Sequence, residues 1–178
     1  MEHRNVTHQF GGPPMETQTI RLNPAPPFPN SALPVILYRN CFTDSKELEH
    51  RLRSNGWIPD WYSAEGMFPY HHFHSDAHEI IAVLKGKLRG KVGGPDGVEV
   101  VMGSGDVIVL PAGVAHIGLA VSADLWTVGG YPSGYAIHDF RLGDMGEYAN
   151  CLANTLSVPS PAADPLGGLD GPLAETWR

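Results

Sequence analysis

The sequence predicts an all-β fold from its composition, from the spacing of its short apolar runs and from the lack of helical crossovers. Of its 178 residues, 21 are glycine and 16 are proline, a content that favours many tight turns. Between residues 57 and 132, short apolar runs alternate with turn sequences such as GGPDG and GSGD. No crossover helix fits between these runs, so the strands should pair antiparallel in a sandwich, jelly roll or small barrel.

The strands themselves are expected where apolar runs end at turn residues. We predict them at 79–85, 87–92, 98–102, 107–110 and 125–131. Together with the segments around them they should form one β-barrel domain over residues 18–158. The pattern contains no internal repeat that would indicate a second unit.

The N-terminal part carries fewer signals of regular structure. Residues 1–17 are polar and without period, and we expect them to form a disordered arm. Five prolines within residues 21–40 indicate an extended segment on a sheet surface, which leads into the apolar run VILY at 35–38.

One short peripheral helix is predicted near residues 44–55. Thr43 to Ser45 offer capping oxygens, and Gly56 supplies the C-terminal stop. Leu48 and Leu52 form a narrow apolar stripe, which indicates that the helix lies on the outside of the barrel.

The C-terminal tail, residues 159–178, is rich in proline and glycine but also carries large apolar side chains. These are Leu166, Leu169, Leu173 and Trp177. A free tail rarely exposes so much apolar surface, so we expect this one to pack on the barrel.

Charge and hydropathy exclude several classes of function. The formal charge is −7 and the basic residues are scattered, which argues against nucleic-acid and membrane partners. No apolar run approaches the roughly 18–20 residues that span a bilayer, and the N-terminus lacks a hydrophobic signal core. We therefore expect a cytoplasmic protein in which Cys41 and Cys151 are free thiols.

The stretch YHHFHSDAHE, residues 70–79, holds four of the nine histidines and indicates a metal site. His72 and His74 are two residues apart, so on a strand they project from the same face. Glu79 begins the next predicted strand, and the later run GDVIVLPAGVAH delivers His116. Three imidazoles and a carboxylate suit a divalent first-row transition metal with coordination positions left open.

The other histidines have plainer interpretations. His3, His8, His50 and His138 are expected to be hydrogen-bonded fillers. His71 and His78 alternate away from the predicted ligands, which favours a supporting or surface role for both. His78 and Tyr70 nevertheless remain our candidates for a catalytic group beside the metal.

The same residues resemble the two motifs of the cupin superfamily. Gly66, His72, His74, Glu79 and Gly86 match G(X)5HXH(X)4E(X)6G, and Gly105, Pro111, Gly113 and His116 match G(X)5PXG(X)2H. Ala120 replaces the usual closing asparagine, which affects a turn contact and no ligand. The resemblance implies a double-stranded β-helix, an RmlC-like jelly-roll barrel, with His72, His74, Glu79 and His116 as metal ligands in its mouth. YHHFHSDAHE, GGPDG, VGGYPSG and DPLGGLDGPLAETW further resemble the YjlB-type single-domain cupins.

We expect the metal to be iron, with manganese, nickel, zinc or copper as alternatives. An aromatic pocket for a small-molecule substrate should surround it, drawn from Trp57, Trp61, Tyr62, Phe68, Tyr70, Trp126 and Tyr131. Lys91 is a candidate partner for a substrate carboxylate, although its parity with Lys87 and Arg89 favours a solvated face.

The leading functional hypothesis is a non-haem metal oxygenase or related oxidoreductase, dioxygenase-like, that acts on an oxygen-rich or aromatic substrate. The alternatives are a non-redox metal-dependent isomerase, lyase or cyclase, and a ligand-binding cupin without turnover. The wider superfamily implied by the resemblance spans all three. Barrel edges and a wrapping N-terminal segment are compatible with a homodimer.

Overall fold

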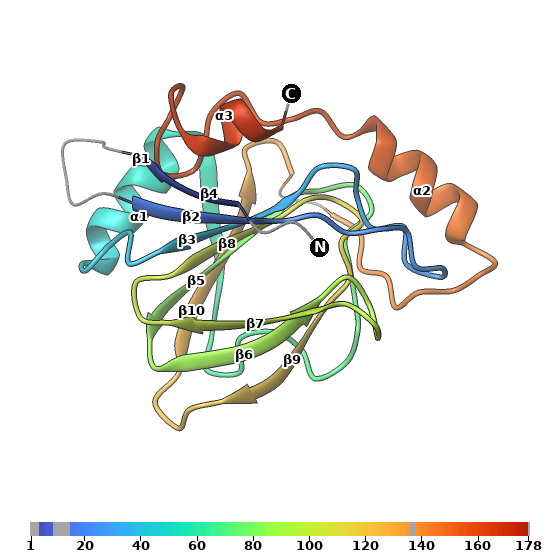
Figure 1. Ribbon diagram of the computed structural model, residues 1–178, viewed down its shortest axis with the longest axis horizontal. Helices are drawn as coiled ribbons and strands as arrows, with labels where there is room; N and C mark the ends of the chain where they lie inside the picture. The colour runs from blue at the N-terminus through green and yellow to red at the C-terminus, as the bar shows by residue number, and fades with distance from the viewer. Residues whose placement is uncertain (1–3, 9–14, 136–137, 178) are drawn as a thin grey trace.

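Antiparallel strands form two sheets that face each other in this computed structural model, which describes residues 4–8, 15–135 and 138–177 (Figure 1). The strands are β1 Arg4–His8, β2 Met15–Ile20, β3 Val35–Arg39, β4 Trp57–Ser63, β5 Glu79–Lys85, β6 Lys87–Val92, β7 Val98–Gly103, β8 Val107–Leu110, β9 His116–Val121 and β10 Trp126–Pro132. The larger sheet has the order β1-β2-β3-β8-β5-β10-β4, and the smaller sheet has the order β7-β6-β9. Every described ladder is antiparallel, so the predicted all-β class is confirmed.

The predicted helix is present as α1, Ser45–Ser54. Its N-cap is Asp44, whose side chain accepts from the backbone N–H groups of Lys46 and Glu47 at 2.7 and 3.2 Å. The structure also contains α2, Tyr148–Ser157, and α3, Pro172–Thr176, which the sequence pattern did not predict. Among the described residues, no helix is long and apolar enough to cross a membrane.

The expected disordered arm over residues 1–17 needs correction. β1 pairs with β2, and β2 in turn pairs with β3, so strands extend the larger sheet at this edge. Thr17 is buried in β2, because the strand lies over the barrel. Residues 1–3 and 9–14 lie outside the described part of the chain. Alternation of polar and apolar residues in this stretch is too weak to distinguish an edge strand from a loop.

Both faces of the central strands β3, β5 and β8 of the larger sheet are buried, which explains their long apolar runs. On β5, Ile80 and Ala82 belong to a cluster that lies under α1 and the C-terminal tail. Ile81 and Val83, which have the opposite parity, belong to the cluster between the two sheets. Successive side chains of a strand point to opposite faces, so β5 separates an outer core from the barrel interior. Glu79 shares the parity of Ile81 and therefore faces the interior.

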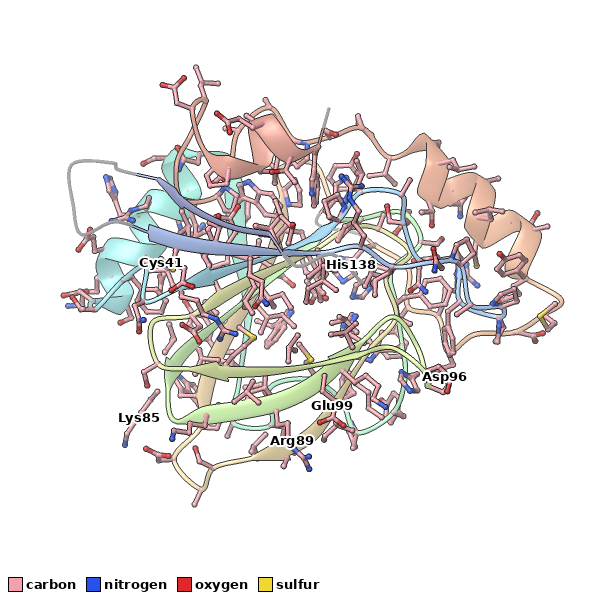
Figure 2. All side chains as sticks on the ribbon, in the orientation of Figure 1. Cys41, Lys85, Arg89, Asp96, Glu99 and His138 are labelled. Carbon is pink, nitrogen blue, oxygen red and sulfur yellow. The ribbon has the colours of Figure 1, made fainter. Side chains whose placement is uncertain are left out.

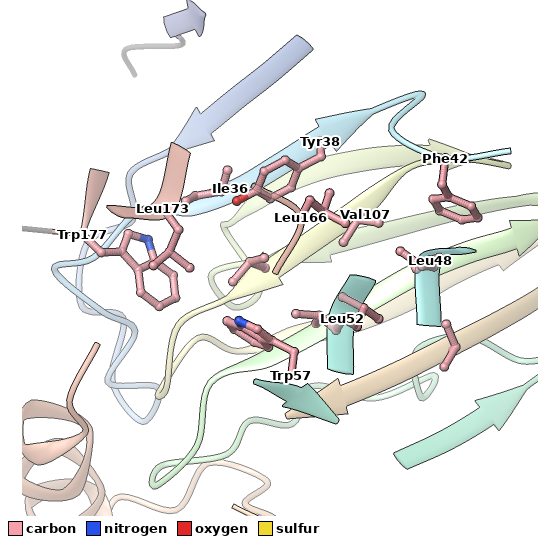
Figure 3. Packing of buried hydrophobic residues seen from close by; sticks show 14 residues of the cluster. Ile36, Tyr38, Phe42, Leu48, Leu52, Trp57, Val107, Leu166, Leu173 and Trp177 are labelled. Carbon is pink, nitrogen blue, oxygen red and sulfur yellow. The ribbon is translucent and has the colours of Figure 1, made fainter. Parts of the chain in front are cut away.

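The tail packs against the outer core (Figure 3). Leu166, Leu173 and Trp177 are buried there, whereas Leu169 is 76% exposed. The tail is held by Asp164, whose buried carboxylate accepts from the Tyr38 hydroxyl at 2.6 Å and from three backbone N–H groups. A carboxylate with this many donors can lie inside a core without a cation.

The tail offers a direct test of this packing. We expect Leu173→Ala to lower the free energy of unfolding by about 2–5 kcal/mol, because Leu173 is 1% exposed and its loss leaves a cavity. Leu169→Ala is the matched control and should change stability by less than about 0.5 kcal/mol. Urea denaturation measures both values, and equal values for the two variants would show that the tail does not form part of the core.

Candidate metal centre

Backbone pairing brings the two predicted metal motifs together. The His72 N–H donates to the His116 carbonyl at 3.1 Å, and the His116 N–H donates to the His72 carbonyl at 2.9 Å. His116 is the first residue of β9, so this bridge places the extended segment 72–74 beside that strand. His72 and His74 then project from the same face, as their spacing predicts.

A turn in the second motif supports His74 from behind. The Gly113 N–H donates to the His74 carbonyl at 2.7 Å. Gly113 has a φ of +82°, and a Cβ there would lie 2.7 Å from the Asn30 carbonyl oxygen. Only glycine adopts this conformation at no cost and leaves room for Asn30, which is why the turn between β8 and β9 requires it.

The three imidazoles present unprotonated nitrogens. Nδ1 of His72 lies 3.2 Å from the Tyr70 carbonyl, Nδ1 of His116 lies 3.1 Å from the Val114 carbonyl, and Nδ1 of His74 contacts the Asp139 carbonyl. A carbonyl can only accept, so Nδ1 carries the proton in each neutral ring. The lone pair is therefore on Nε2, the form in which imidazole binds a metal.

The Glu79 carboxylate faces these rings and is only half satisfied. Oε1 accepts from the Tyr131 hydroxyl at 3.0 Å and from the Trp61 indole N–H at 3.2 Å. Oε2 is buried without a hydrogen-bond partner, at 3.4 Å from Nε2 of His116 and 3.6 Å from Nε2 of His74. The lone pairs of two imidazoles thus face a carboxylate oxygen that accepts no hydrogen bond, an arrangement that a cation would stabilise.

The position of Trp61 depends on Gly129 in β10. A Cβ at Gly129 would overlap the Trp61 indole, so the indole can cross β10 only where that strand has no side chain. Gly129 pairs with Trp61 on β4, and the register shifts by one residue directly after it. This irregularity lets the indole N–H reach Glu79.

Burial controls the protonation of the cluster. It lowers the pKa of His72 to about 4 and the pKa of His116 well below its usual value, so both rings stay neutral near pH 7. Burial also raises the pKa of Glu79. A nearby cation would oppose that effect and favour the charged carboxylate.

The donor set fits a divalent metal ion, although its side chains are farther apart than in a closed coordination shell. Donors in neighbouring positions around an ion lie roughly 3.0–3.4 Å apart, close to the two distances from Oε2. Ring centroids of His72 and His74 are 6.3 Å apart and those of His74 and His116 are 6.4 Å apart. The described residues therefore do not form a closed coordination shell by themselves, and the four ligands remain a prediction.

A cavity of about 410 Å³ lies against this cluster. Four of the seven aromatic residues predicted for the pocket line it, namely Trp61, Tyr62, Phe68 and Tyr131. Met67, His138 and Phe140 also line it but were not expected from the sequence. Its volume is in the range of small-molecule sites.

The segment that follows β10 carries two of these unexpected residues, His138 and Phe140. The Phe140 ring stacks on the His72 ring with centroids 4.9 Å apart, and the His138 ring lies 4.6 Å from the His74 ring. Asp139 accepts from the Ser75 backbone N–H and hydroxyl, both at 2.6 Å, which fixes the segment beside the first motif. His138 is hydrogen-bonded, as we expected, but it also forms part of the cavity wall, which we did not expect. A tertiary contact of this range has no signature in local sequence.

Four other predicted site residues lie elsewhere. Trp57 is buried in the outer core and donates to the Ala163 carbonyl, on the face opposite Trp61, because the irregularity of β4 between these two residues reverses the alternation of its side chains. Trp126 is exposed and stacks on Tyr62 at the outside.

Lys91 donates to the Pro95 carbonyl at 2.9 Å and does not line the cavity. Tyr70 is 44% exposed and stacks on Phe68 beside the cavity, without lining it.

His78 is not suited to catalysis. Its Nδ1 accepts from the Ala112 N–H at 2.9 Å, and its Nε2 lies 3.2 Å from the Pro159 carbonyl, to which it donates. The ring packs on Trp177, with centroids 4.7 Å apart, on the face opposite Glu79. Both nitrogens are therefore occupied in a structural contact with the tail. His71 lies against Phe28, also away from the ligands.

Metal content tests the choice between His78 and the motif residues. We expect His116→Ala to lose an ion that the unmodified protein binds at about one per chain, because one of four donors is removed. His78→Gln keeps a donor and an acceptor on the outer face and should retain the ion. Elemental analysis of both folded variants measures this. Metal loss in His78→Gln alone would contradict the proposed register.

The pH dependence of stability tests the environment of His78. Burial lowers the pKa of His78 from 6.5 to about 4. The unfolded chain therefore binds a proton first as the pH falls, and the free energy of unfolding should decrease between pH 6.5 and pH 4. For His78 the full decrease in the free energy of unfolding is about 3 kcal/mol. His78→Gln cannot titrate, so urea denaturation at pH 7 and pH 4.5 should show a smaller decrease for the variant. An identical decrease in the unmodified protein and the variant would mean that folding does not lower the pKa of His78.

Comparisons with known proteins agree with the fold and the motifs. A family model described as a cupin domain matches residues 62–124. The uncharacterized protein YjlB of Bacillus subtilis (strain 168) is 34% identical over 163 residues, which is 91% of this chain and 97% of YjlB.

Solved structures resemble the chain more weakly. A Klebsiella pneumoniae protein with a double-stranded β-helix domain is 15% identical, with 65% of this chain and 78% of that chain covered and a TM-score of 0.36. Procruciferin of Brassica napus is 12% identical with a TM-score of 0.37, and the match covers 62% of this chain and 22% of procruciferin. The assignment therefore depends on the family model and on YjlB, whose similarity extends along nearly the whole sequence. On these grounds the chain belongs to the cupin family and, within it, to the YjlB-type proteins.

Proposed function

We propose that the protein is a metal-dependent enzyme that acts on a small molecule, in a reaction of the non-haem oxygenase or oxidoreductase type. The observation that carries this proposal is the unpaired Oε2 atom of Glu79, which faces Nε2 lone pairs beside a cavity. His72, His74, Glu79 and His116 would hold one divalent first-row ion, with iron as the first candidate.

The bound ion would supply a Lewis acid and, in the case of iron, redox chemistry. The neighbouring side chains of the protein would position the metal ligands and keep water out of the site. Burial raises the pKa of Tyr131, so its hydroxyl stays protonated and holds the Glu79 carboxylate by a hydrogen bond. Phe68 and Phe140 cover the same cavity with apolar surface.

A non-redox reaction, such as isomerisation, lyase or cyclisation chemistry, is the second candidate. Two groups that can move protons favour it. The rings of Tyr131 and His138 stack with centroids 3.9 Å apart, and both lie next to His74. A hydroxyl and an imidazole beside a bound substrate are suited to general acid and base steps.

Metal analysis and oxygen uptake distinguish the two candidates. We expect the protein from its own host to contain iron at about one per chain. After anaerobic refilling with Fe(II), it should consume oxygen only when an organic substrate from a panel of catechols, hydroquinones and enols is added. His116→Ala is the control and should consume none above background. Tightly held zinc, nickel or manganese, with no oxygen uptake on the panel, would contradict the oxygenase and favour the second candidate.

A further inference from the structure

The charges around the cavity are all of one sign. Among the described residues that line it, the formally charged groups are Glu65, which is exposed, and Glu79, which is buried. No described lysine or arginine lines it. Arg141 comes from the neighbouring segment, but its guanidinium is paired with Asp139 at 2.7 Å and with Glu147 at 3.0 Å. An anionic substrate would therefore meet a carboxylate and no side-chain cation of the described wall, so the bound ion, whose charge Glu79 partly offsets, would be the one positive group near it.

The hydrogen-bonding groups of the wall lead to the same conclusion. The Tyr131 hydroxyl and the Trp61 N–H both donate to Glu79, and the Tyr62 hydroxyl donates to Glu49 at 2.6 Å. Nδ1 of His138 lies 3.3 Å from the Tyr135 carbonyl and donates to it, which leaves Nε2 as an acceptor. These donors are engaged, and of the described wall side chains the Ser63 hydroxyl, which accepts from the Glu65 N–H, is still able to donate, whereas acceptors such as Nε2 of His138 remain. A carboxylate or phosphate group carries acceptors only, whereas a hydroxyl group of a substrate can donate to the remaining acceptors of the wall.

The shape and surface of the wall favour a ring. Phe140 lies flat against His72, and its edge meets the Phe68 ring at a centroid distance of 5.6 Å. Phe68 in turn stacks on Tyr70 at 5.2 Å. A cavity of about 410 Å³ between such faces accommodates one aromatic ring with its substituents.

We propose that this cavity takes an uncharged aromatic molecule that bears hydroxyl groups and that it discriminates against carboxylates and phosphates of the same size. The proposal rests on the proposed function, because it names the substrate class of the same site. Lys91, the one cation that the sequence offered for a substrate carboxylate, lies outside the cavity and bonds to Pro95.

A matched pair of probes tests the discrimination. Calorimetric titration of the zinc-loaded protein at pH 7 would compare 3,4-dihydroxybenzyl alcohol with 3,4-dihydroxybenzoate, which differ in charge but share the ring and both hydroxyls. Zinc avoids turnover during the measurement. We expect the alcohol to bind about tenfold more tightly, or more, since an exposed carboxylate at the wall repels the benzoate. Equal affinity, or tighter binding of the benzoate, would overturn the proposal.

Two charge-reversal variants locate the effect. Glu65→Lys places a cation on the wall and should reduce or reverse the preference for the alcohol. Glu99→Lys makes the same change in net charge on β7, where Glu99 does not line the cavity and is half exposed. Figure 2 shows Glu99 with Arg89 at the periphery, beside the three-stranded sheet. This control should leave the preference unchanged, and equal effects of the two variants would contradict the assignment to the cavity.

The same samples separate this proposal from the proposed function. If the protein binds zinc at about one per chain but prefers the benzoate, the result supports the metal centre and contradicts the proposed substrate class. If zinc does not bind, the metal centre fails, while the affinities of the two probes for the metal-free protein still test the wall, since Glu65 and the aromatic rings do not depend on the ion.

Discussion

The burial of the Glu79 carboxylate is the constraint on which the rest of the site depends. One of its oxygens is held by Tyr131 and Trp61, and the other faces imidazole nitrogens that carry no proton. A buried carboxylate oxygen without a partner costs a folded protein several kcal/mol unless a cation or a proton compensates it. Each neighbouring element has features that maintain this arrangement. Gly129 of β10 leaves room for the Trp61 indole, and the backbone carbonyls behind the three rings fix their protons on Nδ1.

The parity of β5 links the site to the core. Glu79, Ile81 and Val83 face the barrel interior, while Ile80 and Ala82 face the layer formed by α1 and the tail. His78 precedes this strand and is directed to the outer layer, where Trp177 packs on it. The tail thus stabilises the outer face of the same strand that carries the carboxylate on its inner face. A shift of one residue in the pairing of β5 would exchange the roles of His78 and Glu79.

Local sequence predicts most of the strands and the grouping of His72, His74, Glu79 and His116, because these depend on spacing, alternation and turn glycines. It could not predict His138 or Phe140, which reach the cavity through a segment held by Asp139 and Ser75, far from the motifs in sequence. Trp57 was assigned to the wrong side because an aromatic residue near a metal motif suits a pocket and a core equally well. Trp126 was misplaced for a related reason, since spacing alone does not show which strand faces border the cavity, whereas the parity of Lys91 with Lys87 and Arg89 correctly favoured a position outside it.

The central claim is that the chain itself fixes the Nε2 lone pairs of His72, His74 and His116 before any ion binds, with those of His74 and His116 next to Glu79. Histidine side-chain ¹⁵N NMR of the metal-free protein at pH 7 measures the tautomer of each ring directly. The structure predicts the Nδ1–H form for His72, His74 and His116 and the Nε2–H form for His78, and one equivalent of zinc should shift the Nε2 signals of the first three only. Nε2–H forms at these three positions, or a zinc-induced shift at His78 in their place, would contradict this account.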